Sequence, residues 1–198
     1  HSYSSFYSLN ESPEKEIIEN VVDISSHEFF HIVTPLTISS REVKEFNFNE
    51  TVLSKHLWLY EGSTEYTAHH VQVWSGIKTP EQFLATLSQK IDYSRSYFKD
   101  PLSFTELSKE SAGKWAQQYV NVYMKGALIS ACLDLQLLKS SNGQYGIKDL
   151  KHDLSIKYGK EKFFEDEELF DVVTEMTFPE IRNFFNTYVS GTQPLPYE

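Results

Sequence analysis

The chain has 198 residues, of which 40% are hydrophobic and 15% aromatic, and this suits a single domain with a well-filled core. Its formal net charge of −10 argues against a phosphate-binding surface and against attraction to anionic membranes, so we expect no nucleic-acid partner. A single cysteine, Cys132, excludes an intrachain disulfide, and the absence of a long apolar run argues against membrane insertion of this segment.

The first expected helix carries two histidines four residues apart. Pro13 suits the first helical turn, and apolar residues then recur every three or four positions until a proline after Thr34 disfavours further helix. His27 and His31 would project from one face, one turn apart, and could share one cation. Such imidazoles suit Zn²⁺, and Glu28 beside them could take a proton from a water. The alternative is a pair of surface histidines on an amphipathic helix.

Most of the remaining chain is expected to be helical. After an extended lead-in over residues 1–10 and the first helix, residues 36–52 are polar and aperiodic, which predicts a long loop. Any small sheet would be confined to this loop or to the lead-in. Further helices are expected at about residues 54–74, 80–97, 115–139, 148–158, 167–175 and 179–189, with room for a short one within 101–113, before a linker-like tail at 194–198. The pattern therefore predicts a mainly α domain.

A catalytic zinc with two histidine ligands needs a third protein ligand, and Glu61 on the next helix is the leading candidate. Glu65 lies one turn later on the same face, where it could accept the free ring N–H of a liganding histidine. Gly62 removes a side chain where two helices would approach closely. The alternative is that both glutamates belong to a solvated acidic face. The rivals for the third ligand, which we interpret as satisfied or exposed side chains, are His56, Glu50, His69 and His70.

These motifs resemble the catalytic domain of the glycyl aminopeptidase family, a branch of the glutamate-zincins whose best-known fold is thermolysin-like. The histidine pair matches, and residues 58–66 resemble the family's segment of tryptophan, a ligand glutamate followed by glycine, and an acidic residue four later. Residues 123–127 resemble the tyrosine-x-lysine-glycine-alanine segment of related aminopeptidases, and residues 184–197 resemble the end of this catalytic domain. The resemblance implies a thermolysin-like helical domain of about seven helices, with a long loop after the metal-binding helix.

The resemblance also implies a zinc metalloaminopeptidase that hydrolyses the first bond of peptides with a small first residue, Gly or Ala. Zinc held by His27, His31 and Glu61 would polarise the scissile carbonyl and lower the pKa of a bound water. Glu28 would take the proton of that water and pass it to the leaving amine. Tyr123, which alone would be assigned to the core, would stabilise the oxyanion. The alternatives are a thermolysin-like endopeptidase and an inactive peptide-binding module that retains the metal site.

Family members carry a glycine-glycine-x-glutamate-histidine segment for the substrate's amine, and this chain begins about where that segment would end. The family's β-rich amino-terminal domain and its PDZ domain are also missing from the sequence. We therefore expect residues 1–198 to be one catalytic domain that packs against an absent amino-terminal domain and is poorly active alone. The lone cysteine leaves the compartment open, with the periplasm or secretion favoured over the cytoplasm.

Overall fold

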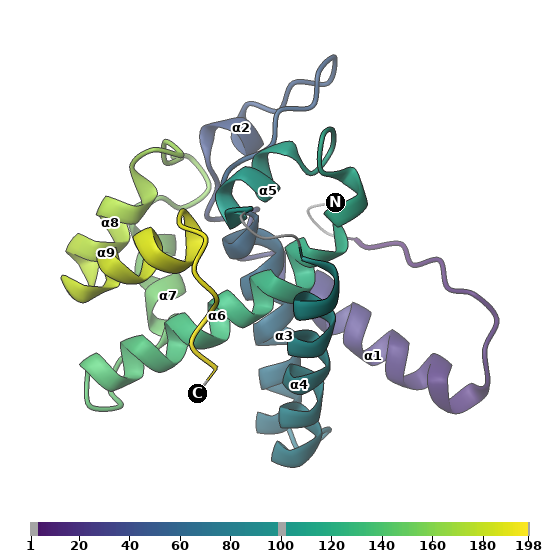
Figure 1. The fold of residues 1–198 in the computed structure, drawn as a ribbon. Helices are drawn as coiled ribbons and strands as arrows, with labels where there is room; N and C mark the ends of the chain where they lie inside the picture. The colour runs from purple at the N-terminus through teal and green to yellow at the C-terminus, as the bar shows by residue number, and fades with distance from the viewer. Residues whose placement is uncertain (1–3, 99–101, 198) are drawn as a thin grey trace.

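A computed structural model of the chain describes residues 4–98 and 102–197, which are built almost entirely of helices (Figure 1). This description does not cover residues 1–3 of the expected lead-in, residues 99–101 or residue 198 of the expected tail. The α-helices of the described residues are α1 (Glu14–Phe30), α2 (Arg41–Lys44), α3 (Ser63–Trp74), α4 (Pro80–Tyr97), α5 (Phe104–Glu110), α6 (Val120–Ser140), α7 (Ile147–Lys157), α8 (Leu169–Met176) and α9 (Glu180–Phe184).

The predicted mainly α class is confirmed. Within the described ranges the chain forms no β-strand, and the expected long loop contributes a single isolated bridge between Ser40 and Phe164. The described part has more α-helices than the expected seven, because the short helix α2 forms inside that loop and α5 forms in the segment for which a short helix was considered. Two π-helical turns, η1 (Trp58–Gly62) and η3 (Phe185–Val189), and a 3₁₀ turn, η2 (Ala116–Gln118), complete the elements.

Local sequence signals explain where several helices begin and end. Helix α4 starts with a capping box, in which the Thr79 hydroxyl accepts a hydrogen bond from the Gln82 amide and the Gln82 side chain accepts one from the Thr79 amide. Pro80 occupies the first helical position, where its missing N–H is not needed. After α6, Asn142 and Gly143 both adopt positive φ angles and turn the chain, as the Asn-Gly pair predicts.

Helix α6 forms the centre of the fold and packs against η1, α3, α4, α5, α7 and α9 (Figure 1). Its residues Ile129, Leu133 and Leu137 recur every four positions and are fully buried, so one face of the helix lies wholly within the core. Other fully buried large side chains come from the surrounding elements, and they include Trp58, Phe104, Leu150 and Phe185. This core anchors one end of each helix that reaches the candidate site.

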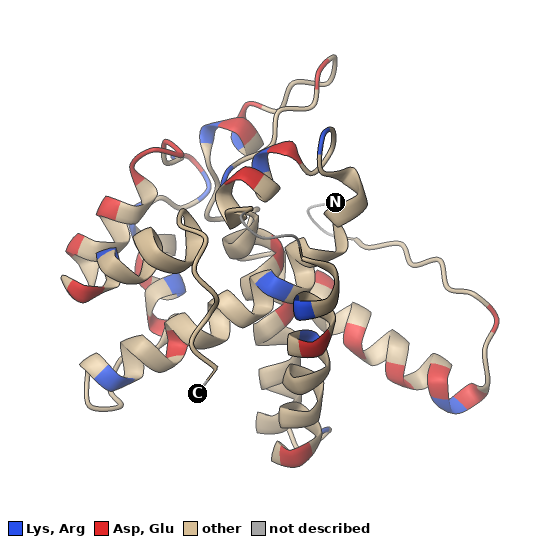
Figure 2. Ribbon diagram, in the orientation of Figure 1, with Lys and Arg blue, Asp and Glu red and all other residues tan. Residues whose placement is uncertain are grey.

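Helix α1 is attached to this body by one end. It packs on α3, and His27 near its C-terminus is its buried residue, whereas its first half projects away from the other helices (Figure 1). Figure 2 shows acidic residues on α1 and on most outer helices, which accounts for the net negative charge. None of the described helices is long and apolar enough to cross a membrane.

The closest approach between elements of the core joins η1 to α6 at two glycines. A Cβ atom on Gly62 would lie 2.3 Å from the carbonyl carbon of Gly126, and a Cβ atom on Gly126 would lie 2.9 Å from the Cα of Gly62. Real Cβ atoms do not come this close to backbone, so both positions require glycine while the two elements keep this separation. The predicted close approach at Gly62 is therefore present, and the element that it meets is α6.

We expect Gly62→Ala to lower the free energy of unfolding by about 1–3 kcal/mol, because the added methyl group forces η1 and α6 apart. Urea unfolding followed by circular dichroism measures this change. Gly113→Ala is the matched control, because a Cβ atom there meets nothing nearer than the Glu110 carbonyl oxygen at 4.0 Å. A Gly62→Ala protein as stable as the Gly113→Ala control would contradict the steric role of Gly62.

Candidate metal centre

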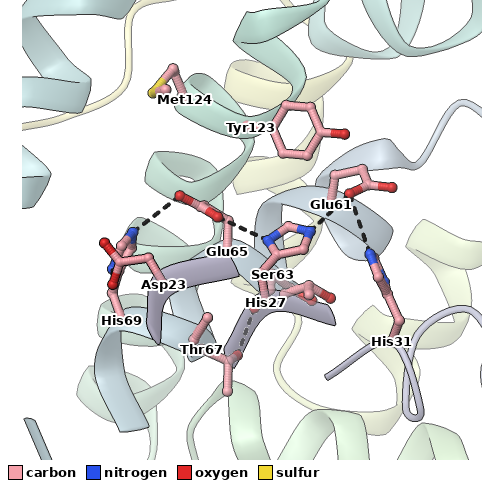
Figure 3. Close-up of polar contacts among 12 residues, drawn as sticks. Asp23, His27, His31, Glu61, Ser63, Glu65, Thr67, His69, Tyr123 and Met124 are labelled. Carbon is pink, nitrogen blue, oxygen red and sulfur yellow. Dashed lines mark hydrogen bonds and ion pairs between the residues drawn. The ribbon is translucent and has the colours of Figure 1, made fainter. Parts of the chain in front are cut away.

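The two histidines of α1 and Glu61 of η1 converge on one point (Figure 3). One carboxylate oxygen, Glu61 Oε2, lies 3.1 Å from His27 Nε2 and 3.6 Å from His31 Nε2. Four ligand atoms at about 2.1 Å from a tetrahedral zinc ion are about 3.4 Å from one another. Both distances to Glu61 Oε2 are therefore close to the spacing of zinc ligands, although residues 27 and 61 belong to different elements.

Both histidines present the same ring nitrogen to this point because the other nitrogen is already engaged. His27 Nδ1 donates a hydrogen bond to Glu65 Oε2 at 2.8 Å, and His31 Nδ1 donates one to the Thr34 carbonyl oxygen at 2.8 Å. Helix α1 ends at Phe30, and His31 follows it in helical geometry (φ −63°, ψ −13°), so the one-turn spacing is preserved. The arrangement fixes each ring orientation in the way that metal-binding histidines require.

Glu61 is carried by a π-helical turn rather than by the regular helix that the sequence predicts from residue 54. The helical backbone begins at Leu57, and the π turn of residues 58–62 leads directly into α3. Trp58 and Tyr60 anchor this turn: the Trp58 indole donates to His56 Nδ1 at 3.2 Å, and the Tyr60 hydroxyl accepts from the Ser40 amide at 2.6 Å. Single π turns occur frequently at functional sites, where the extra residue redirects a side chain.

Charges at the site are concentrated and partly shielded from solvent. Burial alone would lower the pKa of His27, but its hydrogen bonds to Glu61 and Glu65 outweigh that effect and raise the pKa to about 9. Burial alone would raise the pKa of Glu65, but its hydrogen bonds to His27 and His69 and the charge of Lys90 hold that pKa well below its usual range. Without a metal, His27 is thus the cation between two carboxylates.

The proposed catalytic residues Glu28 and Tyr123 lie beside the candidate ligands. His27, Glu28 and His31 offer ligand-type atoms that lie within 4.8 Å of one another. The Tyr123 ring of α6 lies 5.7 Å from the His27 ring, between centroids, and Figure 3 shows it above His27 and Glu61. Burial and the nearby charge of Glu61 raise the pKa of the Tyr123 phenol above its usual value, so the hydroxyl stays protonated at neutral pH.

A cleft of about 460 Å³ opens beside His27 and Glu65 and is large enough for a small ligand. Its walls come from α1, α3, α4 and α6. The side chains that line it include Ile24, Glu28, Thr86, Gln89 and Tyr123. Of the residues with assigned chemical roles, His27, Glu28, Glu65 and Tyr123 line this cleft.

The rival ligands do not approach the histidine pair as ligands, which agrees with their interpretation as satisfied or exposed. His56 is buried, donates from Nε2 to the Asp166 carbonyl oxygen at 2.7 Å, and has a pKa lowered to about 4, mainly by burial. His69 is buried and hydrogen-bonds Glu65, whereas His70 and Glu50 are exposed.

Two further side chains hydrogen-bond Glu65. The sequence did not single out Lys90, and it offered His69 only as a rival metal ligand. Lys90 of α4 contacts Glu65 Oε1 at 2.6 Å, and His69 contacts the same oxygen at 3.0 Å. His69 stands four residues after Glu65 on α3, so helical spacing could have suggested this contact. Lys90 lies on another helix, and nothing in the local sequence pairs it with Glu65.

Comparisons with known proteins agree with this geometry. The family model of M61 glycyl aminopeptidases matches residues 20–129, a range that contains all the candidate ligands and both proposed catalytic residues. Among solved structures, the crystal structure of an aminopeptidase N family protein from Idiomarina loihiensis matches with a TM-score of 0.79 at 22% identity. That match covers 98% of this chain and 34% of the other, and at this identity it shows the fold alone. None of the curated proteins matches significantly.

Replacing Glu61 with alanine should weaken zinc binding at least about 100-fold. Losing a residue that only hydrogen-bonds a metal ligand costs about 10–100-fold in affinity, and losing the ligand itself should cost more. A competition titration with a chromogenic chelator measures the dissociation constant. Glu50→Ala serves as the control, because Glu50 is an exposed glutamate of the preceding loop. Unchanged zinc affinity in Glu61→Ala would remove Glu61 from the ligand set.

Proposed function

We propose that this chain, which belongs to the M61 glycyl aminopeptidase family, carries the catalytic metal site of a zinc-dependent aminopeptidase that removes small residues, Gly or Ala, from peptides. The observation that carries the proposal is the position of Glu61 Oε2, within 3.1 and 3.6 Å of the Nε2 atoms of His27 and His31. Family membership supports the peptidase class, and the motif resemblance supports the small amino-terminal residue.

The donor set fits zinc by its chemistry as well as by its spacing. Two imidazoles and one carboxylate are the protein ligands of a known class of catalytic zinc site, in which a further coordination position stays open. His27, His31 and Glu61 would hold the ion, which when bound polarises a carbonyl and lowers the pKa of water. Glu65 would keep His27 in the tautomer that has its lone pair on Nε2.

Glu28 would act as the general base and then as the general acid. It follows His27 directly in the sequence, and its carboxylate lies within 4.8 Å of the ligand-type atoms of both histidines. It also lines the cleft, so it can meet a substrate without being a ligand itself. From there its carboxylate would accept a proton from the attacking water and pass it to the amine that leaves.

Tyr123 would donate a hydrogen bond to the carbonyl oxygen as negative charge develops on it. Its raised pKa keeps the phenol protonated, which a hydrogen-bond donor requires. The Tyr119 hydroxyl lies 3.2 Å from the Tyr123 hydroxyl and orients it. Such a donor is most effective where water is largely excluded, and Tyr123 is partly buried at the wall of the cleft.

The proposal predicts that Glu28→Gln reduces peptide turnover by about 10²–10⁴-fold, because the amide cannot accept the proton. Zinc affinity should stay close to that of wild type, since Glu28 is not a proposed ligand. The assay follows release of the first amino acid by the full-length protein, with Glu50→Gln as an exposed control. If Glu28→Gln turned over peptides as fast as wild type, Glu28 would not be the base and the catalytic assignment would fail.

An aminopeptidase should cleave a peptide with a free amino terminus and leave the same peptide untouched once its amine is acetylated. Mass spectrometry of glycine- and alanine-initiated peptides, free and acetylated, measures both reactions in one experiment. We expect loss of the first residue from the free peptides alone. Internal cleavage of the acetylated peptides at a comparable rate would instead indicate an endopeptidase of thermolysin type.

A further inference from the structure

Lys90 is a buried lysine in the middle of α4, and its ammonium group points at the metal centre. The residue is 5% exposed, and a buried cation is stable only when a counter-charge is close. That counter-charge is Glu65, whose Oε1 atom lies 2.6 Å from Lys90 Nζ. The Met124 sulfur lies 3.8 Å from the same nitrogen and covers it from α6. Lys90 therefore binds the carboxylate that in turn binds His27.

The hydrogen bonds around Glu65 have one consistent set of directions. Lys78 can only donate, so its contact with His69 Nδ1 at 3.1 Å makes that nitrogen an acceptor. The proton of a neutral His69 ring then lies on Nε2, which donates to Glu65 Oε1 at 3.0 Å. Lys90 donates to the same oxygen, and His27 Nδ1 donates to Oε2 at 2.8 Å. Figure 3 shows Glu65 between His69 and His27.

Charge balance gives a second reason for a cation at this place. The carboxylates of Glu28, Glu61 and Glu65 bring three negative charges to one small region. A divalent metal ion neutralises two of them, and the ammonium group of Lys90 neutralises the third. Without Lys90, the partly buried Glu65 would keep only the imidazoles of His69 and His27 as partners, and its carboxylate could turn or move toward solvent.

We propose that Lys90 is a positioning residue of the metal centre, which holds the Glu65 carboxylate in the place from which Glu65 orients His27. The proposal rests on the proposed function, because it assumes that His27 is a zinc ligand. It makes α4 part of the metal site, although α4 contributes no ligand. Removing the ammonium group should weaken zinc binding 10–100-fold, the usual cost of losing a residue that supports a ligand.

The test compares Lys90→Met with Lys151→Met in the 198-residue chain. Lys151 is a matched control because it is also 5% exposed, yet it contacts the Thr67 hydroxyl at 3.5 Å and the Phe30 ring rather than Glu65. Methionine keeps an unbranched side chain, one atom shorter than lysine, and removes the charge in both variants. Zinc dissociation constants from chelator competition should rise 10–100-fold in Lys90→Met and stay within about twofold of wild type in Lys151→Met.

A second measurement separates positioning of the ligands from a general loss of structure. Co²⁺ in place of zinc has visible absorption bands that depend on ligand geometry. Wild type and Lys151→Met should give the same spectrum, and Lys90→Met should give shifted or weaker bands while its far-ultraviolet circular dichroism stays unchanged. If Lys90→Met does not fold, Lys90→Gln, which keeps a donor but loses the charge, takes its place in both measurements.

The outcomes distinguish this proposal from the proposed function. Wild-type zinc affinity together with a wild-type Co²⁺ spectrum in a folded Lys90 variant would overturn the role of Lys90 and leave the peptidase proposal intact. A Lys90-dependent metal site in a protein that hydrolyses no peptide would support Lys90 and refute the peptidase. A wild-type chain that binds no zinc would overturn both.

Discussion

The backbone contact between Gly62 and Gly126 determines where the chemically important side chains lie. Gly62 directly follows Glu61, and Gly126 lies one helical turn after Tyr123, so the contact that joins η1 to α6 also brings these two side chains to the same side of the core. A side chain at either glycine would force the two elements apart and shift Glu61 relative to Tyr123. The centre therefore depends on the absence of two Cβ atoms as much as on the ligands themselves.

Around this contact, carboxylates and cations alternate across several elements. Asp23 of α1 accepts from Lys78, Lys78 donates to His69, His69 and Lys90 donate to Glu65, and Glu65 accepts from His27. Burying such charges is costly unless each one is paired and hydrogen-bonded, so the network contributes little net stability. Its contribution is orientation, because the chain of contacts ends with His27 Nε2 turned toward Glu61 Oε2 at 3.1 Å.

The sequence was sufficient wherever spacing along a helix decides the outcome. Four-residue spacing placed His27 and His31 on one face and suggested that Glu61 and Glu65 share another, because helical geometry fixes such relations locally. It was insufficient wherever tertiary contacts decide. The π turn at residues 58–62 depends on anchors at His56 and Ser40, and Lys90 lies 25 positions from Glu65, so neither feature leaves a periodic signal.

The candidate metal centre and the cleft beside it share His27 and Glu65 but differ in their other residues. The ligands come from the last turn of α1, its C-cap and η1, all held by packing on α3 and α6, so the projecting first half of α1 is not needed to assemble them. The cleft draws further walls from α1 and α4, through residues such as Ile24, Thr86 and Gln89. Those three residues line the cleft but are not among the proposed ligands. On the proposed function, these residues are where substrate preference could change without loss of the proposed ligands.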